Sequence, residues 1–217
     1  MPSKEKRPKV IFVDAVGTLF GVRGGVGQVY SNVATTFGVT IEPDELNKAF
    51  IESWQGAPPM AFPDVVAEDL HRREFQWWGN IALQTFGKVG AMQQFKDFPA
   101  FFAYLYDYFA TAEPWFLYED TLAALQFWRS EGIELGVISN FDTRIHPVLE
   151  SLGLTDYFKS VTISTEVGAA KPSPLVFLKA LEKHGCSSGE AWHVGDSLKE
   201  DYEGARGVGM HGVLIQR

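Results

Sequence analysis

Residues 9–20 read KVIFVDAVGTLF, an apolar run that ends on a single carboxylate, Asp14, and then turns. The residues before Asp14 are β-branched or aromatic, as in a strand buried on both faces of a parallel sheet. Similar runs follow much later in the chain: IELGVIS (133–139), SVTIS (160–164), AWHVG (191–195) and HGVLI (211–215). The stretch therefore predicts the first strand of a sheet that the second half of the chain completes.

Helical patterns with clear boundaries lie between the later strands. Asp120 precedes TLAALQFWRSEG and Asp142 precedes TRIHPVLESLG, so both aspartates are expected N-caps. Ser173-Pro174 begin a helix that should end at Gly185. Strands that alternate with helices form a parallel sheet covered on both faces, so we predict a doubly wound, Rossmann-like α/β fold.

The interval from about residue 21 to 112 lacks strand-like runs and has helical patterns throughout. The candidate helices are 25–37, 43–55, 64–86 and 91–111. More than half of the aromatic residues fall in this interval, which predicts that it buries a core of its own. We expect an all-helical domain over residues 21–112, inserted into an α/β core made of residues 1–20 and 113–217.

Composition limits the partners and the compartment. The formal net charge is −8 and no basic run occurs, which argues against binding of nucleic acid or an anionic membrane. Cys186 is the only cysteine, so no intramolecular disulfide forms and a reducing compartment is the simpler expectation. The basic start MPSKEKRPK is not followed by a signal-peptide core, and no segment is long enough to span a membrane. We expect a cytoplasmic protein; the sequence does not indicate its oligomeric state.

Polar residues follow the predicted strands at the positions where parallel sheets bind ligands. In an open α/β sheet, ligands lie beyond the carboxyl ends of the strands, near the point where strand order reverses. Asp14 follows the first strand, Ser139 and Asn140 follow the second, and Asp196 follows the fourth. Lys171 comes a few residues after the third strand. We therefore expect these side chains to form one site.

The acidic residues of this set indicate a cation. Two carboxylates brought together repel each other unless a positive charge lies between them. Asp14 and Asp196, with Asp201 behind them, therefore predict a hard divalent cation such as Mg²⁺, bound by oxygens and by a substrate phosphate.

The remaining polar groups suit a phosphate. Ser139 and Asn140 can donate hydrogen bonds, and Lys171 can neutralise both phosphate and aspartates. The turn 15–18 can present backbone N–H groups to an anion, because Gly17 permits a tight path. The predicted site is one for phosphoryl transfer.

Four motifs resemble one family. DAVGT, VISN, the Lys171-Pro172 pair and GDSLKED match, in order and spacing, the motifs of the haloacid dehalogenase-like hydrolase superfamily. The resemblance covers essentially the whole chain, and the helical insertion looks like the cap domain of that superfamily. Shorter stretches, among them QTFG, VISNFD, HVGD and GVGMH, are similar to one subgroup within it.

The resemblance implies roles for the acidic residues. Asp14 would be the nucleophile and form an aspartyl intermediate that water later hydrolyses. Asp196 would bind Mg²⁺ directly, Asp201 would support the metal through water, and the backbone carbonyl of Val16 would be a further ligand.

The resemblance also implies roles around the phosphoryl group. Ser139 and Lys171 would hold this group, while Thr18 and Asn140 would shape the loops.

Val16 departs from the pattern of the superfamily's phosphatases. They carry a second Asp two residues after the nucleophile, which protonates the leaving group and then activates water. General acid–base help is typically worth about 10²–10⁴-fold in rate. Its loss should slow substrates with poor leaving groups, such as sugar alkoxides, and should affect aryl and acyl phosphates least.

Three functions stay open at this point. The first is a Mg²⁺-dependent phosphatase for a small phosphorylated metabolite, with acid–base help from elsewhere or not needed. The second is a carbon–halogen hydrolase, because halide leaves without a proton, although Asp196 would be unfavourable near a carboxylate substrate. The third is a weak or inactive member that binds a ligand or partner; the retained Asp14, Lys171 and Asp196 argue against complete decay.

Other polar and aromatic residues have simpler explanations. His193 is expected to be packed or hydrogen-bonded, and residues 21–28, GVRGGVGQ, are expected to form a hinge. Trp77 and Trp78 are expected in the helical core or at the roof of the pocket.

Overall fold

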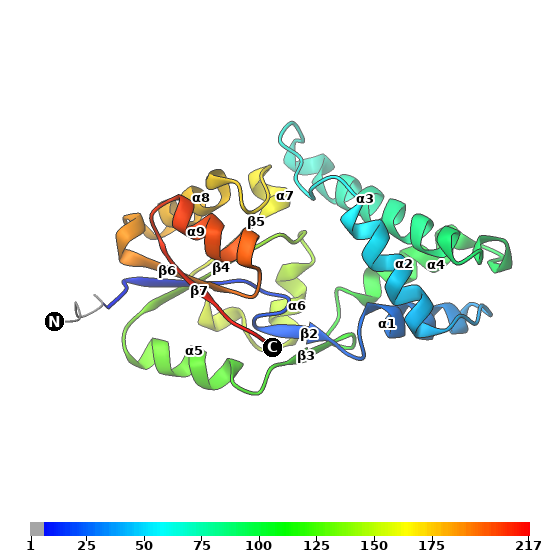
Figure 1. Ribbon diagram of the computed structural model, residues 1–217, viewed down its shortest axis with the longest axis horizontal. Coiled ribbons are helices and arrows are strands. Elements are labelled where there is room, and N and C mark those ends of the chain that lie inside the picture. The colour runs from blue at the N-terminus through cyan, green and yellow to red at the C-terminus, as the bar shows by residue number, and fades with distance from the viewer. Residues whose placement is uncertain (1–6) are drawn as a thin grey trace.

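The computed structural model describes residues 7–217 and is built around a five-stranded parallel sheet of order β5-β4-β1-β6-β7 (Figure 1). The strands that pair in this sheet are β1 (Val10–Val13), β4 (Glu134–Ser139), β5 (Ser160–Ile163), β6 (Ala191–Gly195) and β7 (His211–Leu214). All five runs that the sequence predicted as strands are confirmed, and so is the α/β class.

The first strand is the central one. Val10 pairs with Glu134 of β4 on one side and with Ala191 of β6 on the other, both in parallel. The chain first builds outward to β5 and then returns past β1 to β6, so strand order reverses beside β1. The carboxyl ends of β1, β4 and β6 therefore lie next to one another.

Helices cover both faces of the sheet. Along β1, Ile11 and Val13 point to one face and Val10 and Phe12 to the other, as side chains of a strand do. The first pair packs with residues of α5 (Thr121–Ser130) and α6 (Ile145–Ser151). The second pair packs with residues of α8 (Pro174–His184) and α9 (Gly204–Gly207). The short segments of this half are η2 (Thr155–Tyr157), α7 (Ser164–Val167), η3 (Ser188–Glu190) and η4 (Leu198–Glu203), the last a π-helix.

The segment from residue 26 to 108, which we call the helical unit, lies at one side of the sheet (Figure 1). It contains α1 (Val26–Thr36), α2 (Pro43–Gln55), α3 (Ala67–Lys88), η1 (Met92–Gln94) and α4 (Phe98–Tyr108). Tyr30, Leu46, Phe86 and Phe101 belong to a buried cluster formed within this unit. The prediction that the unit buries its own core is confirmed.

Two short strands join the helical unit to the sheet. β2 (Phe20–Val22) pairs antiparallel with β3 (Trp115–Leu117). The prediction that no strand occurs between residues 21 and 112 is therefore wrong at Gly21 and Val22. Three residues are too few to show an alternating pattern, and their partner lies far away in the sequence.

The observed helix boundaries agree with the sequence-based predictions better than the observed N-caps do. α8 begins at Pro174 and is followed by Gly185 in the left-handed conformation, as predicted. Asp120 directly precedes α5 without capping it, because its carboxylate accepts a hydrogen bond from Arg217. Asp142 lies three residues before α6, and its Oδ1 accepts from the Arg144 N–H at 2.9 Å, as a capping side chain does, and also from the Arg144 side chain.

Within residues 7–217, no helix is long and apolar enough to cross a membrane. The prediction about the N-terminal sequence rests largely on residues 1–6, which lie outside the described part of the chain.

Candidate active site

Asp14 lies at the carboxyl end of the central strand. Its backbone N–H donates to the carbonyl of Val194 at 2.9 Å, which extends the pairing of β1 with β6 by one residue. The side chain is buried, with 7% of the residue exposed. A buried carboxylate requires a charged or hydrogen-bonding partner.

Lys171 is that partner. Its Nζ donates to Asp14 Oδ1 at 2.6 Å and to Asp201 Oδ1 at 2.5 Å. Burial lowers the pKa of Lys171, but the attraction of the two carboxylates outweighs this effect and raises the pKa above its ordinary value. Asn140 fixes the backbone here, because its Oδ1 accepts from the Lys171 N–H at 2.7 Å and its Nδ2 donates to the Lys171 carbonyl.

Asp201 is more central than the sequence suggested. Besides Lys171, it accepts hydrogen bonds from His193 Nε2 at 2.8 Å and from the Ser197 N–H at 3.0 Å. Burial raises the pKa of Asp201, but the His193 hydrogen bond and the charge of Lys171 hold it far below its usual range. A Cβ at Gly195 would lie 2.2 Å from Asp201 Cγ, so only glycine lets β6 approach this carboxylate.

His193 is hydrogen-bonded, in line with its prediction. The ring is buried, and burial lowers its pKa although Asp201 acts in the opposite direction. The imidazole is therefore neutral near pH 7, with its proton on Nε2 toward Asp201. A neutral ring here supports Asp201 without adding a second positive charge.

The three aspartates form a set of oxygens that suits a hard cation. Asp14, Asp196 and Asp201 offer carboxylate oxygens that lie within 4.8 Å of one another. Burial, and then repulsion from Asp14 and Asp201, raise the pKa of Asp196. Three carboxylates face one ammonium group, and the excess negative charge together with an all-oxygen donor set fits Mg²⁺. The contribution of the Val16 carbonyl stays a prediction.

Gly17 holds the loop against this acidic cluster. Its φ of 85° is left-handed, and a Cβ at this position would lie 2.4 Å from Asp196 Oδ2. The Gly17 N–H donates to the carbonyl of Phe20 at 2.9 Å and is engaged within the loop, while the binding of an anion by the turn 15–18 stays a prediction. Gly17 acts by close approach to Asp196.

Thr18 and Ser139 are two predicted site residues, both in the described part of the chain, for which the structure gives no hydrogen bond to Lys171. Thr18 lines a smaller cavity of about 210 Å³ together with Asp120, and Lys171 is not part of its lining. Its carbonyl accepts from Arg217 at 2.6 Å, in line with the predicted role in shaping the loop, and its contact to phosphate stays a prediction. Ser139 ends β4 and is buried beside the site, and its predicted hydrogen bond to phosphate stays a prediction.

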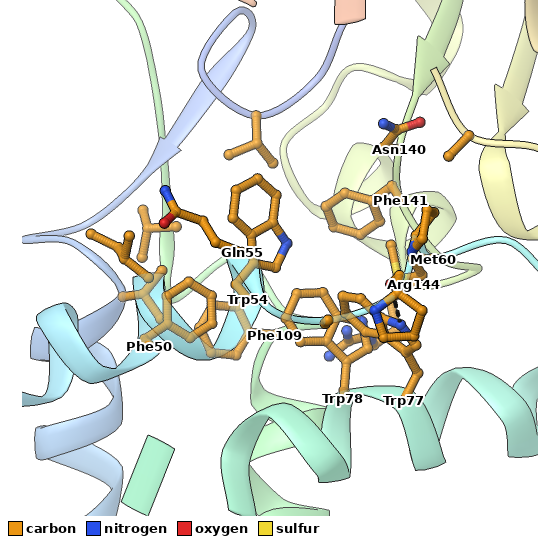
Figure 2. A pocket seen from close by; sticks show the side chains of 18 of the residues that line it. Phe50, Trp54, Gln55, Met60, Trp77, Trp78, Phe109, Asn140, Phe141 and Arg144 are labelled. Atoms are coloured by element: carbon orange, nitrogen blue, oxygen red, sulfur yellow. Dashed lines mark hydrogen bonds between the residues drawn. The ribbon is translucent and has the colours of Figure 1, made fainter. Parts of the chain in front are cut away.

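A pocket of about 700 Å³ opens between the helical unit and the carboxyl edge of the sheet. Val16, Asn140 and Lys171 line it on the sheet side. On the helical side its walls are aromatic, and Figure 2 shows Phe50, Trp54, Phe109 and the two adjacent tryptophans of α3. Val16 thus contributes an isopropyl group to the pocket.

Glu200 is a pocket residue that the sequence analysis did not single out. Its Oε2 accepts from Asn140 Nδ2 at 3.1 Å, and burial raises its pKa. Glu200 lies in η4, between Asp196 and Asp201, so its position in the GDSLKED motif was the available signal.

Contacts between the helical unit and the loop after β4 were also missed. Glu74 of α3 is fully buried and accepts from the Thr143 N–H at 3.0 Å and from Thr165 Oγ1 at 2.6 Å. Trp78 Nε1 donates to Asp142 Oδ2 at 2.5 Å. These polar contacts join α3 to the sheet half beside the pocket.

Arg144 completes this junction. Its Nε and Nη2 donate to the two oxygens of Asp142 at 2.9 and 2.6 Å, and its Nη1 donates to the Tyr106 carbonyl at 2.9 Å. The guanidinium group also lies 3.7 Å from the ring centroid of Tyr106. Each of its three nitrogens therefore donates within the protein, although Arg144 lines the pocket.

The doubly wound sheet and the acidic centre at its carboxyl edge define an α/β protein of the Rossmann-like class with a candidate cation site. The chain belongs to the haloacid dehalogenase-like hydrolase family, whose model matches residues 8–209. It is 35% identical over 208 residues to haloacid dehalogenase-like hydrolase domain-containing protein 3 of Mus musculus, covering 93% of this chain and 79% of the mouse protein. The short stretches QTFG, VISNFD, HVGD and GVGMH indicated the subgroup that contains this mouse protein, and that prediction is confirmed.

Solved structures share the fold. A HAD phosphatase from Thermococcus onnurineus is 28% identical with a TM-score of 0.62, covering 96% of this chain and 86% of its own. A HAD hydrolase from Bacillus subtilis bound to magnesium has a TM-score of 0.71 at 15% identity, covering 94% of this chain and 87% of its own. At 15% identity, the similarity to the Bacillus subtilis protein shows a shared fold only.

Proposed function

We propose that the protein is a Mg²⁺-dependent phosphatase that hydrolyses a small phosphate monoester, with Asp14 as nucleophile. The observation that carries this proposal is the buried ion-paired group in which Lys171 bridges Asp14 and Asp201. The similarity to a phosphatase from Thermococcus onnurineus supports it. The expected substrate is a phosphorylated metabolite, without nucleic acid or membrane partners.

The proposed reaction has two steps. The Asp14 carboxylate attacks phosphorus, the bond from phosphorus to the leaving oxygen breaks, and an aspartyl-phosphate forms. Water then attacks the same phosphorus and releases phosphate and the free carboxylate. Lys171 offsets charge that develops on the transferring group, and Ser139 positions it from the end of β4. Asn140 holds the backbone of Lys171 in place, because both hydrogens of its amide are engaged within the protein.

Asp14, Asp196 and Asp201 are the residues that would hold Mg²⁺. The ion, when bound, supplies positive charge that offsets the negative charge of the phosphoryl group. The helical unit would act as a cap, because its aromatic wall covers the pocket and limits the access of water.

A carbon–halogen hydrolase is the weaker alternative. Val16 is compatible with it, because halide leaves without a proton. The carboxylate of a haloacid, however, would approach a centre in which three aspartates face one lysine. The excess negative charge of the site therefore favours hydrolysis of a phosphate ester with bound Mg²⁺ over hydrolysis of a haloacid without metal.

The first prediction concerns Asp14→Asn. Loss of the nucleophile should reduce hydrolysis of aryl and acyl phosphates at least about 10³-fold, measured as phosphate release with and without Mg²⁺. Asp69→Asn, at an exposed position of α3, is the control and should keep full activity. Turnover of a haloacid without metal would overturn the phosphatase, and equal activity of wild type and Asp14→Asn would favour a binding protein.

The second prediction concerns Val16→Asp. An acid installed here should speed alkyl phosphates by about 10-fold or more, within the range of general acid catalysis, and aryl phosphates by much less. The measurement is kcat for both classes, with Val16→Asn as a control of similar size that carries no acid. An equal effect on both classes would mean that another group already donates the proton.

A further inference from the structure

The walls of the pocket beside Lys171 restrict which leaving group the site accepts. On the sheet side the pocket reaches Lys171, which holds Asp14 at 2.6 Å. Asp14 contacts Lys171 but does not itself line the pocket, so we take the pocket as the space that receives the leaving group of a phosphate attacked by Asp14. Figure 2 shows the rings of Trp54, Phe109 and Phe141 around it, with the amide of Asn140 at its edge. The group attached to the leaving oxygen must occupy an aromatic chamber.

Several polar groups in this chamber are already engaged. The indole N–H of Trp77 donates to the Pro58 carbonyl, and that of Trp78 donates to Asp142. The guanidinium of Arg144 is held by Asp142 and by the Tyr106 carbonyl. A sugar has several hydroxyl groups, and along this aromatic wall they would lose water without a full replacement, because the other charged or amide side chains in the lining, apart from Asn140 and Lys171, are Gln55, Lys199 and Glu200.

The chamber is large enough for one or two rings. Its volume of about 700 Å³ lies within the range of small-ligand pockets. Aromatic rings gain from edge-to-face and offset contacts with walls of this kind. Trp54 lies at the mouth, with 47% of the residue exposed, and so can contact a ligand without being essential to the core.

Val16 adds an independent requirement. Its side chain occupies a place on the pocket wall, two residues after Asp14, and it cannot donate a proton. A leaving group that departs as a stable anion does not need one. Apolar walls favour a ring, and Val16 favours an acidic alcohol; a phenol meets both conditions.

We infer that the substrate is an aryl phosphate, the phosphate monoester of an apolar phenol-type compound; this inference rests on the proposed function. Asp14 attacks phosphorus, the bond between phosphorus and the aryl oxygen breaks, and its electron pair stays on the phenolate. Water then attacks phosphorus, the bond to Asp14 breaks, and the proton of that water ends on the phenolate. The products are the phenol and inorganic phosphate.

Four substrates separate the two requirements. Phenyl phosphate has a ring and a stable leaving anion, benzyl phosphate has a ring and an alkoxide, acetyl phosphate has a stable anion and no ring, and glycerol phosphate has neither. With Mg²⁺, kcat for phenyl phosphate should exceed that for benzyl phosphate about 10²-fold or more, because no acid helps the alkoxide. KM for phenyl phosphate should lie about tenfold below that for acetyl phosphate.

Trp54→Ala tests the chamber itself. This change should raise KM for phenyl and benzyl phosphate about 3- to 10-fold and leave acetyl phosphate within about twofold. Phe127→Ala is the matched control, because Phe127 is 61% exposed on α5 and lies outside the pocket lining. It should leave all substrates unchanged.

Each contrary result has a distinct meaning. Acetyl phosphate turned over with a KM equal to that of phenyl phosphate, or benzyl phosphate hydrolysed as fast as phenyl phosphate, would overturn the aryl class and leave the phosphatase intact. An equal effect of Trp54→Ala on all four substrates would do the same. No Mg²⁺-dependent hydrolysis of any of the four would overturn the phosphatase itself.

Discussion

At the scale of single residues, the acidic centre brings together three carboxylates whose oxygens lie within 4.8 Å of one another. Lys171 lies between Asp14 and Asp201, while Asp196 has a raised pKa because burial and its two neighbours disfavour its charged form. Proton binding by Asp196 and Mg²⁺ binding therefore compete, so Mg²⁺ affinity should fall as pH drops.

The third prediction concerns Gly17→Ala. A Cβ here would meet Asp196 at 2.4 Å and strain a φ of 85°, so the variant should be destabilised by about 1–3 kcal/mol. Gly38→Ala is the control, because Gly38 has a φ of 79° and nothing within 4 Å of an added Cβ. Thermal unfolding with and without Mg²⁺ should show that only Gly17→Ala weakens the Mg²⁺-dependent stabilisation. Equal effects of both changes would mean that backbone strain alone matters.

At the scale of elements, α3 is fastened to the loop after β4 by buried charge. Asp142 is fully buried and receives donors from Arg144 and from Trp78 of α3. Glu74, one turn earlier on the same helix, accepts from Thr143 and Thr165. The loop that carries Asn140 into the site is thus fixed to the helical unit.

The fourth prediction compares two neighbouring tryptophans. Trp78→Phe keeps an aromatic ring but removes the N–H that Asp142 accepts, and should cost about 1.5–3 kcal/mol as a bond to a charged group. Trp77→Phe removes a bond to the exposed Pro58 carbonyl and should cost about 1 kcal/mol or less. Chemical denaturation of the two variants measures both costs. Equal costs would indicate that ring shape, and not the bond to Asp142, holds α3 in place.

At the scale of the whole molecule, buried histidines make the stability depend on pH. His184 of α8 lies with Nδ1 2.7 Å from Glu134 and Nε2 2.8 Å from Ser160. Burial lowers its pKa below the ordinary value of 6.5, although Glu134 acts in the opposite direction. As pH falls below 6.5, the unfolded chain binds a proton on this ring before the folded chain does, so stability is lost.

The fifth prediction is that His184→Gln flattens this dependence. Between about pH 7.5 and 5.5, the wild type should lose more stability than the variant, by at most about 1.4 kcal/mol per pH unit. Glu74, Asp196 and Glu200 have raised pKa values and act in the opposite direction, so the difference between the two proteins is the measurement. His71→Gln, at an exposed position of α3, is the control. A variant with the wild-type slope would contradict the assignment.

Much of the fold followed from local pattern. The apolar runs that became β1, β4 and β6 are largely buried on both faces, so hydrophobicity marked them, and the edge strands β5 and β7 are marked by short apolar, β-branched runs although β7 is partly exposed. The antiparallel pair of β2 and β3 was not predictable, because it joins residues 20–22 to residues 115–117 across the helical unit. The predicted cap at Asp120 was wrong for a similar reason, since Arg217, at the far end of the chain, donates to its carboxylate.

The sequence by itself determined the sheet and the identity of the charged groups at its edge, because strand burial and carboxyl-end positions are local properties of the chain. Only the tertiary structure placed Asp201 in contact with both Lys171 and His193, and brought Val16 and Trp54 to the same pocket. These contacts join distant segments, and their distances depend on how the helical unit packs on the sheet. The charge of the site was therefore predictable, whereas the shape that selects a substrate was not.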